Sequence, residues 1–135
     1  MTTYFLDTNH LGHAIRVVSP VRERILKSRR QGVRFACCWP VLCELEAGIV
    51  QMKGTPRYRR FLKTVLKEVR IWPQDANMVK TFGEVHLLLK QRGRALSHVD
   101  KVLAAFAMTG TNVTILTTDS DFYALPEIRT ANWLS

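Results

Sequence analysis

Five acidic side chains lie at or near the ends of apolar segments in a chain that is otherwise poor in acids. Only 11 of its 135 residues are Asp or Glu, against 20 Lys and Arg. Carboxylates gathered in an apolar pocket repel one another and raise one another's pKa values unless a cation neutralises them. Mg²⁺ is the hard cation suited to such a site, with Mn²⁺ a close substitute, and either can activate water for attack on a phosphate ester. The five acids are Asp7, Glu44, Asp100, Asp119 and Asp121.

Most of these acids also fit a purely structural role. Asp7 precedes a helical pattern and can cap it, and Asp100 can complete a capping box that Ser97 opens. Asp119 and Asp121 fit a turn. Taken one at a time, these residues would therefore not predict a metal site.

Glu44 is harder to assign to a structural role. It lies in a helical stretch that is apolar almost all round, so we expect its side chain to be buried, where an unpaired charge is costly. Glu46 would point about 200° further round the same helix. Gly48, one turn after Glu44, leaves room for a close approach. We therefore favour Glu44 as the site residue of this helix.

Strand-like and helical patterns alternate along the chain and must position these acids. We expect strands at residues 3–6, 33–38, 69–72 and 112–118, with a weak fifth at 128–130. We expect six helices: after Asp7, from Pro20 to Gly32, from Pro40, from 57 to about Lys67, from about Asp75 to Gln91, and from Asp100 to Met108. Val18 should lie on the inner side of the first helix, and Val79 and Leu87 on the inner side of the fifth.

This alternation predicts one α/β domain over residues 1–135, with a mostly parallel sheet of four to five strands and helices on both faces. In such sheets, ligands bind outside the carboxyl ends of the strands. Asp7 and Asp119 each follow a strand, Glu44 is in the helix after a strand, and Asp100 starts the helix before one. The acids can therefore converge at one edge of the sheet.

The charge balance indicates a polyanionic partner. The net charge is +9, and residues 16–34 and 53–70 each hold seven Lys or Arg against a single Glu. Clustered cations of this kind release counterions from a phosphate backbone. A solvated basic surface without such a partner is an equally good explanation of the charges alone. Tyr58, among three arginines, is a candidate for stacking on an unpaired base.

The remaining composition is typical of a cytoplasmic protein. No secretory signal or membrane span is apparent, and the three cysteines, Cys37, Cys38 and Cys43, are expected to be reduced and buried. His10, His13 and His86 have no metal-ligand spacing, and we expect them at the surface or the edge of the core.

Four stretches together resemble the PIN-domain ribonucleases, in particular the VapC-type toxins of bacterial toxin–antitoxin pairs. They are YFLDTN at 4–9, ELEAG at 44–48, LSHVDKVLAAFA at 96–107 and ILTTDSDFYALP at 115–126. The resemblance covers almost the whole chain. It implies a PIN-like three-layer sandwich, a homodimer, Mg²⁺-dependent cleavage of RNA to a 3′-hydroxyl and a 5′-phosphate, and inhibition by a small cognate antitoxin.

Carried over by position, the resemblance implies an acidic site of Asp7, Glu44, Asp100 and Asp119, with Asp121 as a supporting acid. Which of Asp119 and Asp121 approaches the metal stays open, and we favour Asp119 because it follows the strand sooner. We expect three polar neighbours to support the site: Thr8 and Asn9 by orienting Asp7, and Thr117 by bonding a carboxylate or a water. Val41 departs from the family, since many relatives have Ser or Thr there.

Two other functions are compatible with parts of the pattern. One is a catalytically inactive PIN-like module that binds RNA or protein, although such a module would gain nothing from repelling carboxylates beside a phosphate. The other is a phosphatase with Asp7 as nucleophile, which lacks the second Asp at the position of Asn9.

Overall fold

Five parallel strands form the sheet of this protein, in the order β3-β2-β1-β4-β5. The structure is a computed structural model and describes residues 1–134. The predicted parallel sheet is confirmed, including its fifth strand. The strands are β1 (Thr3–Leu6), β2 (Arg34–Cys37), β3 (Arg70–Ile71), β4 (Val113–Leu116) and β5 (Arg129–Ala131).

Six α-helices and one 3₁₀ helix connect these strands within the described residues. Their starts follow local chemistry: Ser19 caps α2 through the Arg22 N–H, and Pro20 occupies the first turn, where no backbone donor is needed. The helices are α1 (Thr8–Ala14), α2 (Pro20–Arg30), α3 (Trp39–Ile49), α4 (Thr55–Leu66), α5 (Ala76–Gln91), α6 (His98–Thr109) and the 3₁₀ helix η1 (Ser120–Ala124). None of them is long and apolar enough to cross a lipid bilayer.

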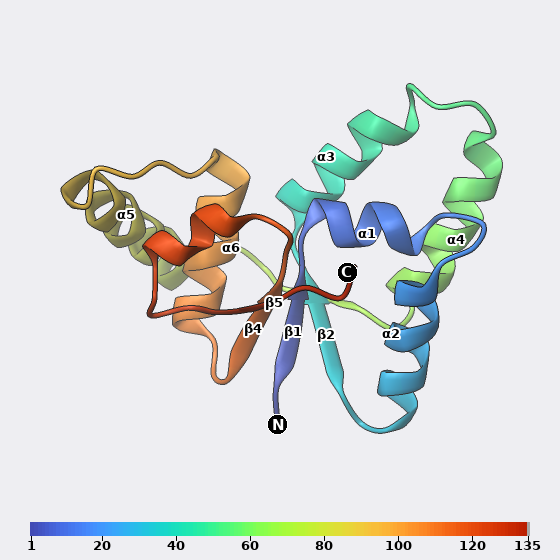
Figure 1. The fold of residues 1–135 in the computed structure, drawn as a ribbon, viewed down its shortest axis with the longest axis horizontal. Coiled ribbons are helices and arrows are strands. Elements are labelled where there is room, and N and C mark those ends of the chain that lie inside the picture. The colour runs from blue at the N-terminus through green and yellow to red at the C-terminus, as the bar shows by residue number, and fades with distance from the viewer. Residues whose placement is uncertain (135) are drawn as a thin grey trace.

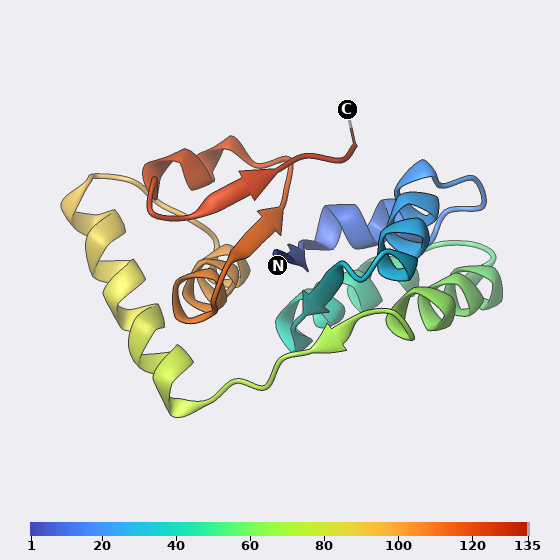
Figure 2. The same cartoon turned by 90° about the horizontal axis from the view of Figure 1, so that it is seen from below.

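Helices cover the sheet in two groups (Figures 1 and 2). α5 and α6 lie together on one side, whereas α1, α2 and α4 contact one another on the other side. α3 touches both groups, through α1 and α6. The strands point their carboxyl ends toward the edge where α1 and α3 begin.

β1 is the central strand, and the strands on both sides of it are in register with its last residues. Leu6 pairs with Leu116 of β4, and Phe5 pairs with Ala36 of β2. The Asp7 N–H continues the ladder by donating to the Leu116 carbonyl at 3.2 Å. The residues that follow β1 and β4 therefore begin side by side.

An aromatic cluster fills the core beside β1. The Phe5 ring is fully buried, and its centroid is 5.3 Å from those of both Trp72 and Phe106. Offset and edge-to-face contacts of this kind add to the free energy gained by burying the rings. This packing holds β1 rigidly under the acidic edge.

Some predicted inward-facing residues are exposed. α1 ends at Ala14, so Val18 lies beyond the helix and is 81% exposed. α5 buries Met78, Val85 and Leu89, a narrow stripe at helical spacing. Val79 and Leu87 lie off this stripe and are exposed, because α5 packs mainly on α6 and needs no wider apolar face.

Candidate acidic active site

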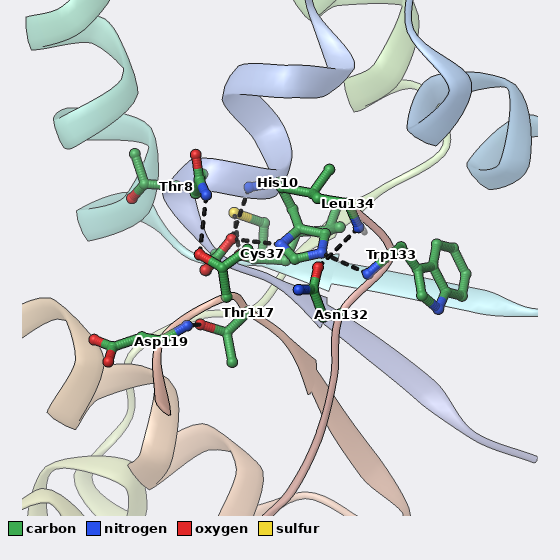
Figure 3. A network of polar contacts seen from close by, with 12 residues as sticks. Thr8, His10, Cys37, Thr117, Asp119, Asn132, Trp133 and Leu134 are labelled. Carbon is green, nitrogen blue, oxygen red and sulfur yellow. Dashed lines mark hydrogen bonds and ion pairs between the residues drawn. The ribbon is translucent and has the colours of Figure 1, made fainter. Parts of the chain in front are cut away.

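Asp7 is a buried carboxylate at the carboxyl end of the central strand. It is 7% exposed and caps α1. Its Oδ1 atom accepts the His10 backbone N–H at 2.7 Å and lies 2.9 Å from His10 Nδ1 (Figure 3). The capping role considered for Asp7 is therefore real, and within residues 1–134 the hydrogen bonds to this side chain involve Oδ1 alone.

Asp119 occupies the matching position after β4. The Thr117 hydroxyl accepts the Asp119 N–H at 3.1 Å (Figure 3). Asp119 Oδ1 in turn accepts the Asp121 N–H at 2.8 Å. Asp119 thus caps η1 and is half-buried, whereas Asp121 is exposed. These two bonds fix the turn that brings the first acid of the pair to the edge of the sheet.

Asp100 meets both of these acids from the first turn of α6. Its pKa is raised to about 6, first by burial and then by the neighbouring carboxylates of Asp119 and Asp7, against a lowering effect of the Ser97 hydroxyl. Ser97 also caps α6 by accepting the Asp100 N–H at 3.1 Å. Three acids from distant parts of the chain therefore share one electrostatic environment.

Glu44 reaches the same region from α3, but in a different setting from the one predicted. The prediction that its side chain is buried is wrong: Glu44 is exposed, because α3 buries only Val41, Leu45 and Ile49. Its Oε1 atom accepts the Thr8 hydroxyl at 2.5 Å. Val41 is fully buried, and the Thr8 hydroxyl is the donor to Glu44.

The polar neighbours make different contacts from the expected ones. Thr8 bonds Glu44 rather than Asp7, and Asn9 Nδ2 donates to the Thr118 hydroxyl at 3.0 Å. Thr117 is buried and bonds the Asp119 backbone. These contacts tie the start of α1 to α3 and to the loop after β4, so they order the edge rather than the Asp7 carboxylate itself.

Comparison with known proteins identifies the family. A family model for the PIN domain matches residues 4–128. This chain belongs to the PIN-domain family. Among curated proteins, Ribonuclease VapC2 of Rickettsia felis is 26% identical to this PIN domain over 131 residues, which are 96% of this chain and 97% of the relative.

Two solved structures illustrate the similarity of the fold. One is the crystal structure of VapBC2 from Rickettsia felis bound to a DNA fragment from their promoter. A chain of that structure superposes on this PIN domain with a TM-score of 0.84 and is 25% identical to it. The match covers 97% of this PIN domain and 98% of that chain. The other is VapBC-5 from Mycobacterium tuberculosis, a member of the VapBC family of toxin–antitoxin systems. A chain of that structure superposes on this PIN domain with a TM-score of 0.70 at 20% identity, and the match covers 96% of this PIN domain and 98% of that chain.

The acids of this PIN domain form a donor set suited to a hard cation. Carboxylates that raise the pKa of a neighbour bind a cation favourably, because the cation removes their mutual repulsion. Among residues 1–134, no three His, Cys, Asp or Glu side chains already stand at ligand positions around one point. A cation that retains several waters, as Mg²⁺ does, needs fewer protein oxygens at ligand distance than one that is held in a closed protein cage.

A pocket of about 380 Å³ adjoins this edge between α1, α3 and α4. Thr8 and Glu44 lie at its acidic end, and Gly48 and Tyr58 line it further along. Its volume is in the usual range of ligand sites. Tyr58 is half-buried against the core, so its ring is held in place beside the pocket.

Two side chains differ from the sequence-based expectation, His10 and Cys43. His10 is fully buried rather than at the surface or the edge of the core, and it contacts Asp7 directly. Its position three residues after a capping Asp is the signal that could have revealed this contact. Cys43 is exposed, although Cys37 and Cys38 are buried as predicted. Burial raises the pKa of the Cys37 thiol, and raises that of Cys38 to about 11, so neither thiol ionises near neutral pH.

Several of the clustered cations are engaged within the PIN domain. Arg22 donates to the carbonyls of residues 14, 16 and 17, and Arg24 lies 3.8 Å from the centroid of the Trp133 ring. Arg59 pairs with Glu46 at 2.6 Å. The basic stretches are therefore partly structural. Fewer Lys and Arg side chains are available to an anionic partner than the net charge of +9 suggests.

Proposed function

We propose that this PIN domain is a metal-dependent endoribonuclease, the toxin of a type II toxin–antitoxin pair. The observation that supports the proposal is the arrangement of three acids: Asp7 and Asp119 follow the neighbouring parallel strands β1 and β4, and their carboxylates contribute to the raised pKa of Asp100 in α6. The name of the curated relative, a ribonuclease, supports the choice of RNA as substrate. The toxin–antitoxin context is supported by the solved VapBC complexes.

Three residues would hold the metal, which we take to be Mg²⁺ or Mn²⁺. Asp7 would bind it through Oδ2, since His10 contacts only Oδ1. Asp100 and Asp119 would bind it through their carboxylate oxygens, from α6 and from the turn after β4. When bound, the metal would neutralise these charges, polarise a phosphate oxygen and make water more acidic. Asp121, which is exposed and lies in η1 two residues after Asp119, would support the site from its rim.

Glu44 would orient the attacking water. Its exposed carboxylate can accept a hydrogen bond from water, while the Thr8 hydroxyl holds Oε1 and restricts the rotation of the side chain. A water held in this way is directed at the phosphorus atom, in line with the leaving 3′-oxygen, which would yield a 3′-hydroxyl and a 5′-phosphate. Positioning of this kind lowers the barrier because it removes rotational freedom before the reaction.

The basic surface and the pocket would bind the rest of the RNA. Phosphates on either side of the cleaved bond would meet exposed Lys and Arg, giving an affinity that falls with salt. A base beside the cleaved bond would enter the pocket and stack on Tyr58.

The proposed partner is a small cognate antitoxin, and we expect the PIN domain to act in the cytoplasm as a homodimer. The two solved relatives described above are VapBC assemblies, which supports a protein partner for this chain as well. The alternative is a catalytically inactive PIN-like module that binds RNA or protein. The two hypotheses differ in one measurable property, since only the nuclease converts RNA to shorter products.

The test uses the purified protein, freed of any co-purifying partner and of metal. Structured RNA would be incubated with it in EDTA, Mg²⁺ or Mn²⁺, beside the variant Asp7→Asn. We expect cleavage with either metal, none in EDTA, and at least a 100-fold loss for Asp7→Asn. Equal behaviour of wild type and variant, or cleavage that is indifferent to EDTA, would overturn the proposal.

Asp75→Asn is a matched control. Asp75 caps α5 by accepting the Met78 N–H at 2.8 Å, much as Asp7 caps α1, but it is not among the acids that raise the pKa of Asp100. Asn caps a helix about as well as Asp, so the capping oxygen is kept in both variants. Asp75→Asn should therefore stay near wild-type stability and cleave RNA like wild type, which shows that neutralising a capping carboxylate does not by itself abolish cleavage.

A further inference from the structure

His10 is a fully buried ionisable side chain in contact with Asp7, and the proposed reaction has no use for it. The residue is 0% exposed and lies in the first turn of α1. Its ring Nδ1 is 2.9 Å from Asp7 Oδ1, the same oxygen that accepts the His10 backbone N–H (Figure 3). Two donors from one residue therefore converge on one oxygen of the Asp7 carboxylate.

The other ring nitrogen identifies the tautomer. His10 Nε2 lies 3.1 Å from the backbone nitrogen of Trp133, near the end of the chain (Figure 3). A backbone N–H can only donate, so Nε2 must be the acceptor and carries no hydrogen. The ring is consequently neutral, with its single N–H on Nδ1, and that N–H points at Asp7.

The Trp133 amide is itself held in place by packing. The Trp133 ring centroid is 4.8 Å from that of Tyr4 and 5.7 Å from that of Phe35, and the Arg24 guanidinium covers the ring at 3.8 Å. The segment 132–134 follows β5, which pairs with β4, and His10 lies in α1, which follows β1, so both ends of this contact are attached to the sheet. The tautomer of His10 is thus set by the sheet and not by solvent.

We propose that His10 is a positioning residue for Asp7, and that the segment 132–134 holds it in the productive tautomer. The inference rests on the proposed function, because it concerns the use of Asp7 as a metal ligand. Fixing Oδ1 with two donors leaves Oδ2 as the oxygen without a hydrogen bond among residues 1–134, and so as the one available to a cation. A neutral N–H suits this task, because a Lys or Arg in the same place would cancel the negative charge that the cation needs.

The amide side chains offer matched variants for a test. In His10→Asn, the amide nitrogen takes the place of Nδ1 and can still donate to Asp7, but no acceptor remains for the Trp133 N–H. In His10→Gln, the amide lies near the place of Nε2, so it can serve Trp133 and not Asp7. His10→Leu removes both contacts. Comparison of the three therefore separates the bond to Asp7 from the bond to the C-terminal segment.

The first measurement is made without metal and without substrate. The ¹⁵N chemical shifts of the His10 ring should show a neutral ring protonated on Nδ1, with His10→Asn used to assign the signal. Trp133→Pro removes the donor to Nε2, whereas Trp133→Ala keeps it and removes only the indole ring. We expect the Nδ1–H tautomer to persist in Trp133→Ala and to be lost in Trp133→Pro. A wild-type ring protonated on Nε2 would overturn the inference, whatever the enzyme does.

The second measurement is Mn²⁺ affinity, followed by the electron paramagnetic resonance signal of free Mn²⁺. Loss of a group that orients a metal ligand typically costs 10- to 100-fold in metal affinity. We expect about a 10-fold loss for His10→Gln and His10→Leu, and a partial rescue to within about 3-fold of wild type for His10→Asn. The kcat for RNA cleavage at saturating Mn²⁺ should follow the same order, and the melting temperature of each metal-free variant reports any general loss of folding.

The outcomes separate this inference from the proposed function. If wild type binds Mn²⁺ and cleaves RNA, and all three His10 variants do so equally well, His10 is only a core residue and the inference falls alone. If His10→Asn and His10→Gln lose affinity equally and in proportion to their melting temperatures, a positioning role is also overturned. If wild type neither binds Mn²⁺ nor cleaves RNA, the proposed function and this inference fall together.

Discussion

The Thr8 hydroxyl donates a hydrogen bond of 2.5 Å to the Glu44 carboxylate, and this bond joins the first residue of α1 to the middle of α3. The two residues are 36 positions apart in the chain. Because Glu44 is exposed, this bond is the contact that restrains its side chain among the described residues. An acid that orients water needs such a restraint, since a freely rotating carboxylate samples many unproductive directions.

Removing the Thr8 hydroxyl should therefore impair catalysis more than stability. Thr8→Val keeps the shape of the side chain, and we expect kcat for RNA cleavage to fall roughly 10-fold. The free energy of unfolding should change by only about 1 kcal/mol, since one partly exposed hydrogen bond is lost. Thr8→Ser retains the hydroxyl and should stay near wild type. Equal kcat values for the Val and Ser variants would contradict the role assigned to this bond.

The raised pKa of Asp100 predicts a pH-dependent stability of the metal-free protein. This pKa is about 6 in the folded protein, against about 3.9 for Asp in an unfolded chain. Folding therefore favours the protonated carboxyl, so its stabilising effect is complete below about pH 4 and is lost as the pH rises through about 6. In EDTA, the melting temperature of Asp100→Asn should rise relative to wild type between pH 4 and 7. A constant difference across this range would exclude the predicted titration, and Mg²⁺ should reduce the pH dependence of wild type.

A pair of neutral substitutions should distinguish the two acids that follow β4. Asp119 is among the groups that raise the pKa of Asp100, and Asp121 is not. Asp119→Asn should therefore lower the Asp100 pKa toward its ordinary value, whereas Asp121→Asn should leave it close to 6. The measurement is a titration of the Asp100 carboxyl carbon by ¹³C NMR in metal-free protein. The reverse order of the two variants would make Asp121 the acid nearer to Asp100.

Substitution of Arg22 should change the stability of the protein and not its binding of RNA. Its guanidinium donates to the carbonyls of Ala14, Arg16 and Val17 at 2.5–3.0 Å and lies 4.0 Å from the centroid of the Phe61 ring. A Lys side chain cannot form this fork, so Arg22→Lys should cost about 1–3 kcal/mol in urea unfolding. Arg30→Lys, at an exposed position of the same helix, should be neutral. If RNA binding fell with Arg22→Lys but stability did not, Arg22 would be a phosphate contact instead.

The order of the elements could be predicted because each depends on local pattern. Pro20 and Pro40 start helices, and the alternation of strand and helix leaves a parallel sheet as the only simple arrangement. The convergence of Asp7 and Asp119 followed from the same rule, since both come directly after parallel strands. These predictions required no knowledge of how the side chains pack.

The environments of individual side chains could not be predicted in this way. Glu44 was expected to be buried because its helix is apolar, yet α3 packs along one face only and leaves the other to solvent. His10 was expected near the surface, but its partner Trp133 is 123 residues away, and no local pattern reports such a contact. Contacts between distant segments decide burial, and a single sequence does not contain them explicitly.

The central position of β1 has a consequence for the order of events during protein synthesis. β1 needs β4 as a neighbour, and Asp7 needs Asp119, Asp100 and the backbone of Trp133, all of which are translated much later. A nascent chain that has emerged only as far as β3 carries Asp7 and Glu44 but none of these partners. On the proposed function, such a chain is therefore inactive toward RNA, and the acidic site can form only after β4, η1 and the segment 132–134 have been translated.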